Sequence, residues 1–159
     1  MAFIILNNQK KEKPILKILL FTEGTTLGPK VWYEWFFVAR YVPIKNAVEK
    51  LLRWEDQGAI INYITSRTAY KDVEKIRNLL LSYNFPGCKL YYRDKGEKYS
   101  NIVETELPNV LIEDNCKSIG GKWQMAITYV RQDIRERIKS IVVSEFKGID
   151  NLPDSIYNL

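Results

Sequence analysis

Polar residues suited to binding phosphate and metal come directly after apolar segments of this chain. They form three clusters and one separate lysine: Thr22-Glu23, Thr65-Ser66-Arg67, Glu113-Asp114 and Lys98. A hydroxyl and the amides of a helix start can bind a phosphate oxygen, a lysine can neutralise its charge, and an acidic pair can hold Mg²⁺. If the fold brings these clusters together, the sequence predicts a site for a phosphate-bearing small molecule with Mg²⁺ as its cofactor.

The composition narrows the available chemistry. The chain has no histidine, so the usual general base, the serine-hydrolase triad and the commonest transition-metal ligand are all missing. The 24 lysines and arginines against 19 aspartates and glutamates give a formal charge of +5. This charge is spread along the chain, whereas a dedicated nucleic-acid binder concentrates its basic residues. We therefore do not expect nucleic acid as the partner.

The spacing of apolar residues predicts the elements that position the clusters. Strands are expected over 17–21, 59–64, 89–93, 109–112 and 140–143, and helices over 44–57, 68–83, 98–106 and 131–139. Continuous apolar strands that alternate with helices indicate a parallel sheet with helices on both faces. Right-handed connections then place the carboxyl ends of the strands at one edge. The expected fold is α/β, a three-layer Rossmann-like sheet, with Thr68 capping the second helix.

The length and the apolar content predict a single domain. With 159 residues, 46% of them hydrophobic, the chain is long enough for one sizeable core and too short for two. We expect a mobile tail over 1–13 and one domain over 14–159. No apolar run reaches the length of a membrane span, and the first residues lack the features of a signal peptide. A cytoplasmic protein without a membrane partner is therefore expected. Cys88 and Cys116 fit neither a disulfide framework nor a zinc-finger spacing and are expected to be structural thiols.

The segment 31–41 holds six aromatic residues in eleven positions, without a clear period. The favoured interpretation is a short helix whose aromatic face packs against the domain, since aromatic stripes usually belong to a core. A second interpretation is a small cap that covers a site. A third is a surface that meets a partner or a second copy of the chain, so oligomerisation stays open.

The first cluster resembles a known signature. In the haloacid dehalogenase superfamily of phosphohydrolases, a hydrophobic strand ends in Asp-x-Asp-Gly-Thr-Leu, and here the strand ends in Thr22-Glu23-Gly24-Thr25-Thr26-Leu27. Aligned without a gap, Thr22 takes the place of the nucleophilic aspartate and Gly24 that of the acid/base aspartate. Aligned on Gly24-Thr25, those places fall to Phe21 and Glu23. Neither register restores the nucleophile.

The resemblance extends over residues 15–145 and implies roles for the other clusters. Thr65 matches the second-motif hydroxyl, Lys98 the third-motif lysine, and Glu113-Asp114 the fourth-motif acidic pair that helps to hold Mg²⁺. Ser66 and Arg67 would join Thr65 in binding substrate. The resemblance also implies the fold of that superfamily, with a small cap insertion over 28–42.

A structural role stays open for each candidate residue. Thr22 and Glu23 can form an ordinary turn after a strand, and the hydroxyls of Thr65 and Ser66 can cap a helix while Arg67 is solvated. Lys98 can be a surface lysine, and the acidic pair can cap Ser118-Ile119. The segment with Arg131, Arg135 and Arg137 is expected to be a solvated helix face.

Three hypotheses follow from the altered first signature. A threonine carries no charge at neutral pH and has no histidine to activate it, so loss of the aspartate removes both the nucleophile and a metal ligand. The first hypothesis is a degenerate phosphatase site that binds a phosphate-bearing small molecule without efficient turnover. The second is a magnesium-dependent phosphohydrolase that uses Glu23, or a metal-bound water held by Asp114. The third is an interaction domain that uses the segment 31–41.

Overall fold

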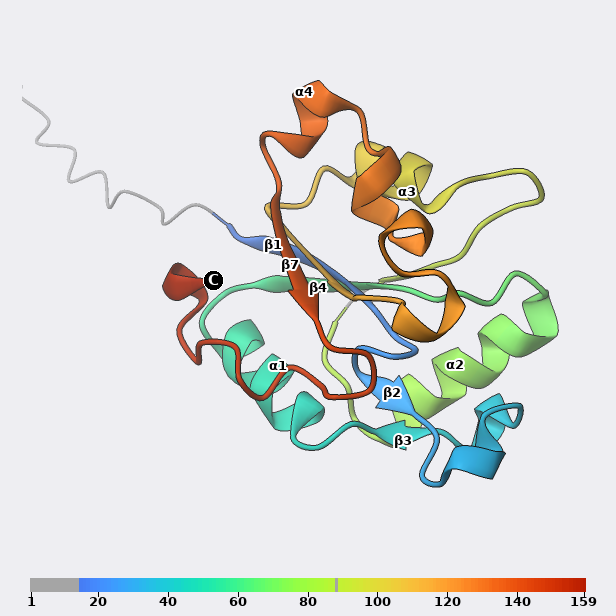
Figure 1. Ribbon diagram of the computed structural model, residues 1–159. Helices are drawn as coiled ribbons and strands as arrows, with labels where there is room; N and C mark the ends of the chain where they lie inside the picture. The colour runs from blue at the N-terminus through green and yellow to red at the C-terminus, as the bar shows by residue number, and fades with distance from the viewer. Residues whose placement is uncertain (1–14, 88) are drawn as a thin grey trace, which may run out of the picture.

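Five parallel strands form one sheet in the computed structural model, which describes residues 15–87 and 89–159 (Figure 1). The strands are β1 (Lys17–Phe21), β4 (Ile60–Ile64), β5 (Lys89–Tyr91), β6 (Val110–Asp114) and β7 (Lys139–Val143). Their order across the sheet is β5-β4-β1-β6-β7. The tail predicted over 1–13 and Cys88 lie outside the described residues.

Helices cover both faces of the sheet. They are α1 (Ala47–Asp56), α2 (Tyr70–Ser82), α3 (Tyr99–Glu106) and α4 (Gln132–Arg135). Because successive side chains of a strand point to opposite faces, Ile18 and Leu20 of β1 share a core with α1 and α2, whereas Leu19 and Phe21 share one with α3 and α4. Figure 1 shows the two pairs of helices on opposite sides of the sheet. The predicted three-layer α/β fold is confirmed. Among the described helices, none combines the length and the apolar character needed to cross a membrane.

The strand order creates a switch point beside β1. The chain runs outward from β1 to β4 and β5, then returns to the other side of β1 to form β6 and β7. In open α/β sheets a crevice forms at the carboxyl ends of the strands where the order reverses, and ligands bind there. In this protein that position is the carboxyl ends of β1 and β6, which carry the first and the last predicted cluster.

The segment after β1 leaves the sheet and returns through a small antiparallel pair, β2 (Leu27–Gly28) and β3 (Val42–Pro43). Between them lie two 3-10 helices, Trp32–Glu34 and Val38–Arg40. The prediction that the aromatic face packs against the domain is wrong for most of this segment. Four of its aromatic side chains are between 53% and 88% exposed, namely Trp32, Tyr33, Phe36 and Phe37. Two short turns cannot present all six rings to one side.

Several element boundaries differ from the predictions for local reasons. The first helix begins at Ala47 instead of Ile44, because Lys45 has a left-handed backbone with φ 50°. Thr68 does not cap α2, which begins after Ala69 without a side-chain cap. The helix predicted over 131–139 is shorter in the structure, where it is α4. One reason is that Lys139 belongs to β7, which pairs with β6. The last strand is confirmed, one residue longer than predicted.

The C-terminal segment packs back onto α1. The side chain of Lys50 is almost fully buried, and its Nζ donates to the Leu152 carbonyl at 2.7 Å and to Asp154 Oδ1 at 2.5 Å. Trp54 Nε1 donates to the Pro153 carbonyl at 3.0 Å. These contacts fix the end of the chain against the helix that supports β1 and β4.

Candidate functional site

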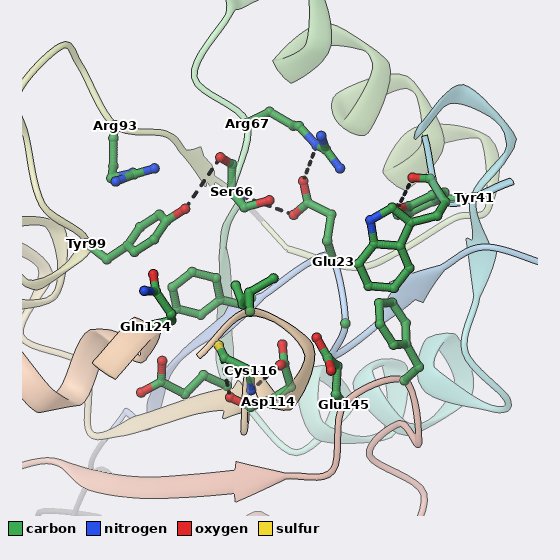
Figure 2. Close-up of a pocket in the computed structure, with 16 residues that line it drawn as sticks. Glu23, Tyr41, Ser66, Arg67, Arg93, Tyr99, Asp114, Cys116, Gln124 and Glu145 are labelled. Carbon is green, nitrogen blue, oxygen red and sulfur yellow. Dashed lines mark hydrogen bonds and ion pairs between the residues drawn. The ribbon is translucent and has the colours of Figure 1, made fainter. Parts of the chain in front are cut away.

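A cavity of about 340 Å³ opens at the carboxyl edge of the sheet (Figure 2). Each of the five parallel strands, or the loop directly after it, contributes polar residues to its wall: Glu23, Ser66 and Arg67, Arg93, Asp114 and Cys116, and Glu145. The edge that the sequence predicted as a site is therefore a real concavity, of the size that holds small ligands. We call it the first cavity.

Glu23 is held by the loop that follows β4. Its Oε1 accepts from Thr65 Oγ1 at 2.7 Å. The same oxygen accepts from Arg67 Nε at 3.3 Å, and Oε2 accepts from the Ser66 amide at 3.1 Å (Figure 2). The side chain of Glu23 is only 9% exposed. Three donors from consecutive residues thus surround one carboxylate. We call Thr65, Ser66 and Arg67 the anion-binding loop.

Thr22 does not reach the first cavity. It is completely buried, its amide donates to the Ile64 carbonyl at 2.9 Å, and its hydroxyl contacts the same carbonyl and the carboxylate of Glu23. The backbone carbonyl of Thr22 accepts from the amides of Thr26 and Leu27. Thr22 therefore closes the turn after β1, and no substrate atom can approach its hydroxyl from the first cavity.

Glu113 supports a neighbouring turn. Its Oε2 accepts from the Ala126 amide at 2.7 Å and its Oε1 from the Ile127 amide at 3.0 Å, and the residue is 2% exposed. Burial raises the pKa of Glu113 from its usual value of 4.5 to about 7. The two hydrogen bonds lower the pKa and so offset part of this rise. The alternative that the acidic pair caps Ser118-Ile119 is wrong, since the Ser118 amide donates to Glu145 instead.

Asp114 packs directly on the turn after β1. Its Oδ1 accepts from the Cys116 amide at 2.7 Å, and its Oδ2 lies 3.5 Å from Thr25 Oγ1. A Cβ at Gly24 would lie 2.5 Å from Oδ2, so only glycine fits there. Burial raises the pKa of Asp114, and the charge of Glu145 raises it further, while the hydrogen bond from Cys116 opposes this shift.

These donors do not fit the Mg²⁺ ion that the resemblance implies. Glu113 already uses both oxygens on backbone amides, and Thr22 has no charge. Within 15–87 and 89–159, no group of three or more His, Cys, Asp or Glu residues could hold a metal ion. Mg²⁺ requires oxygen ligands in near-octahedral arrangement, usually with one or two carboxylates. In the predicted set, Thr22 offers no charge, Glu113 is held by two backbone amides, and Asp114 has one oxygen on the Cys116 amide, so we derive no chemical step through a metal.

The predicted cation Lys98 lies outside the first cavity. Its Nζ is 5.6 Å from the centroid of the Tyr129 ring, in a second cavity. Arg93 lines the first cavity instead, with its Cζ 4.0 Å from the centroid of the Tyr99 ring. In the described part of the chain, no carboxylate pairs with Arg93, and its buried Nε has no hydrogen-bond partner.

Sequence reasoning overlooked Arg93 and Glu145 as site residues. The available signal was their position: Arg93 ends the predicted strand 89–93 and Glu145 follows the predicted strand 140–143, at the edge where the other clusters gather. Glu145 binds Ser118, with its Oε1 accepting from the hydroxyl at 2.7 Å. The first cavity thus has Arg93 and the Arg67–Glu23 pair on one side, and Asp114 and Glu145 on the other (Figure 2).

The segment between β2 and β3 supplies an aromatic wall. Trp35 and Tyr41 line the first cavity, and the Tyr41 hydroxyl donates to the Trp35 carbonyl at 2.8 Å. The Trp35 ring also packs edge-on against Phe146, with 4.9 Å between ring centroids. These two rings of the 31–41 segment turn toward the site, whereas the other four turn away from it.

Comparison with solved structures agrees with this architecture. The chain is similar to the class C acid phosphatase from Bacillus anthracis with tungstate bound, with a TM-score of 0.58, 16% identity, and coverage of 87% of this chain and 70% of that chain. It is also similar to a chain of the Pnkp1/Rnl/Hen1 RNA repair complex, with a TM-score of 0.57, 16% identity and coverage of 82% of this chain. The protein spans 43% of the length of that RNA repair chain.

The family comparison gives no further assignment. A scan against protein-family models finds no match, and neither does a search of curated proteins. The protein shares the fold of that acid phosphatase, a three-layer α/β fold as the sequence predicts. At this level of identity the likeness concerns the fold alone.

Proposed function

We propose that this protein binds a phosphate-bearing small molecule in the first cavity without efficient turnover. The observation that carries the proposal is the anion-binding loop, whose hydroxyl, amide and guanidinium all donate to one carboxylate. Charge-assisted hydrogen bonds from arginine and a backbone amide are the usual means of holding a phosphate oxygen. In this conformation Glu23 takes the place of the ligand's oxyanion.

A phosphate would bind by displacing Glu23 from the anion-binding loop. Arg93 would add a second cation, since no described carboxylate pairs with it and its Nε lacks a partner. The ligand must then compete with a carboxylate that is covalently part of the protein. We therefore expect modest affinity for inorganic phosphate alone and higher affinity for a ligand that makes further contacts.

We infer that efficient turnover is absent because the residues expected for phosphoryl transfer are replaced or buried. In one register the nucleophile position falls to Thr22, which is completely buried and has no histidine to activate it, and in the other register it falls to Phe21, which carries no nucleophile. Without a carboxylate at the nucleophile position or a fitting metal site, and with Glu23 held by the anion-binding loop, phosphoryl transfer lacks its main sources of rate enhancement. This supports binding without hydrolysis over a surviving magnesium-dependent phosphohydrolase.

Calorimetric titration of the full chain with inorganic phosphate and a panel of phosphate esters tests the proposal. We expect at least one ester to bind, and Arg67→Ala to weaken that ester's affinity by about tenfold or more, because a charged hydrogen bond contributes about 1.5–3 kcal/mol. Arg77→Ala is the matched control, since Arg77 is an exposed arginine of α2 that pairs with Glu74. Phosphate release by the wild type should not exceed that of Arg67→Ala. Absence of binding by every ester, or equal affinity in Arg67→Ala, would refute the proposal.

A second candidate function is protein interaction through the segment 31–41. Its support is the exposure of four aromatic rings, with Trp32 and Phe36 at 85% and 88%. Exposed aromatic clusters of this kind mark interaction surfaces on soluble domains. The solution mass tests self-association: a dimer that Trp32→Ser with Phe36→Ser converts to a monomer supports it, and a monomer at all concentrations argues against it.

A further inference from the structure

A second cavity, also of about 340 Å³, lies next to the first. Arg93, Tyr99 and Gln124 line both cavities and form the wall between them. In Figure 2 these three residues stand together on one side of the first cavity, opposite Tyr41. A ligand whose phosphate lies on Arg93 can therefore extend its remaining atoms past this wall into the second cavity.

The second cavity presents flat aromatic surfaces. Trp123 and Tyr129 line it and remain 60% and 50% exposed. The Tyr129 hydroxyl donates to the Trp123 carbonyl at 2.9 Å, which fixes one residue relative to the other. Exposed rings of fixed orientation are the usual surface on which a nucleobase stacks, because every base offers a π face.

Charge and hydrogen-bonding groups surround these rings. Lys98 Nζ lies over one face of the Tyr129 ring, 5.6 Å from its centroid, and Arg93 stands at the wall shared with the first cavity. The side-chain amide of Gln124 makes no hydrogen bond with any other residue in the described ranges and faces both cavities. An amide offers both donors and an acceptor, which is what the edge of a base requires. A sugar phosphate without a base would leave both the rings and this amide unused.

We propose that the ligand of the two cavities is a mononucleotide, with its phosphate on Arg67 and Arg93 and its base stacked on Trp123 or Tyr129. The inference rests on the proposed function and names its ligand class. It gives Lys98 a role that differs from the predicted one, as a cation beside the base-binding rings instead of a partner of the anion-binding loop.

Titration with three ligands tests the proposal: inorganic phosphate, ribose 5-phosphate and adenosine 5′-monophosphate. We expect the nucleotide to bind at least about tenfold more tightly than ribose 5-phosphate, since stacking of one base contributes about 1–3 kcal/mol. Trp123→Ala should reduce the affinity for the nucleotide to that for ribose 5-phosphate and leave the latter unchanged. Trp32→Ala is the control, because Trp32 is more exposed than Trp123 and lines neither cavity.

The outcomes separate this inference from the proposed function. If ribose 5-phosphate and the nucleotide bind equally well, or if Trp123→Ala keeps the difference between them, the mononucleotide is refuted while phosphate binding stands. If none of the three ligands binds, even to Glu23→Gln, in which the competing charge is absent, both proposals fail. The comparison of ligands in the wild type decides the matter independently of whether a variant is well folded.

Discussion

Glu23 and the anion-binding loop form a charge-paired unit that is largely withdrawn from water, with the side chains of Glu23 and Arg67 9% and 32% exposed. A buried charge that loses its partner is costly, because the remaining group keeps its desolvation penalty. The same contacts that stabilise the empty protein must be broken when an anionic ligand enters. Stability and binding are therefore opposed at this residue.

Replacement of Glu23 should lower stability in a way that phosphate repairs. We expect Glu23→Gln to reduce the free energy of unfolding by about 1–3 kcal/mol, because Arg67 loses its charged partner. Addition of phosphate should then raise the melting temperature of Glu23→Gln more than that of the wild type. Thermal unfolding with and without phosphate measures both effects. Glu34→Gln, which removes a carboxylate that pairs with exposed Arg40, should show no phosphate effect beyond that of the wild type.

Glu113 should give stability a measurable dependence on pH. Its folded pKa of about 7 lies above its usual value of 4.5, so the folded state binds the proton more tightly than the unfolded state does. Protonation of Glu113 therefore adds about 3 kcal/mol to the free energy of unfolding below about pH 4.5, and this stabilisation is lost as the pH rises toward 7. The free energy of unfolding, measured with urea between pH 5 and pH 8, should fall as the pH rises. This fall should be smaller in Glu113→Gln. Identical slopes in the two proteins would show that Glu113 titrates normally.

Among the elements, the turn after β1 is the most tightly constrained part of the site. Gly24 has a φ of +81°, and Asp114 occupies the space where its side chain would be. A residue with a side chain would have to strain the backbone and displace the carboxylate at once. The turn thus fixes the ends of β1 and β6 against each other at the switch point.

Gly24→Ala should therefore cost more stability than the backbone conformation alone explains. Gly58 is the matched control, because it also has a positive φ, of +98°, but nothing lies within 4 Å of the position of its Cβ. We expect Gly58→Ala to cost about 1 kcal/mol and Gly24→Ala about 2–4 kcal/mol. Denaturant unfolding of both variants measures the difference. Equal losses would mean that Asp114 moves aside freely.

The strands could be predicted from the sequence because their burial on both faces leaves continuous apolar runs. Lys17–Phe21 illustrates this, and the three-layer fold followed from the alternation of strands with helices. The loops could not be predicted in the same way. The direction of the 31–41 rings and the place of Lys98 depend on backbone turns, such as two short 3-10 helices, that leave no period in the sequence.

The sequence predicts where the candidate site residues lie in the fold, but not which of them contact one another. Thr65, Ser66, Arg67 and Asp114 do gather at one edge with Glu23, as strand order implies. The sequence carries no signal that a carboxylate from β1 would occupy the anion-binding loop, since this depends on side chains more than forty positions apart. The functional assignment of these residues stays a proposal.

At the scale of the whole molecule, the C-terminal segment secures the layer beneath β1 and β4. Lys50 is 7% exposed and bonds the segment through Leu152 and Asp154. We expect Lys50→Met, which keeps most of the buried stem, to release residues 152–159 and reduce the unfolding free energy by about 1–3 kcal/mol. Hydrogen exchange of that segment measures the release. Arg53→Met, which removes only an exposed contact with Asp154, should leave exchange near the wild-type rate.

On our proposal, Glu23 occupies a site for an external phosphate. The most direct test is calorimetric titration of inorganic phosphate into the wild type and Glu23→Gln, side by side at neutral pH. We expect Glu23→Gln to bind phosphate at least about tenfold more tightly, because the competing charge is gone while Thr65, Ser66 and Arg67 remain. Equal or weaker binding by Glu23→Gln would mean that Glu23 occupies no phosphate site and that its contacts are purely structural.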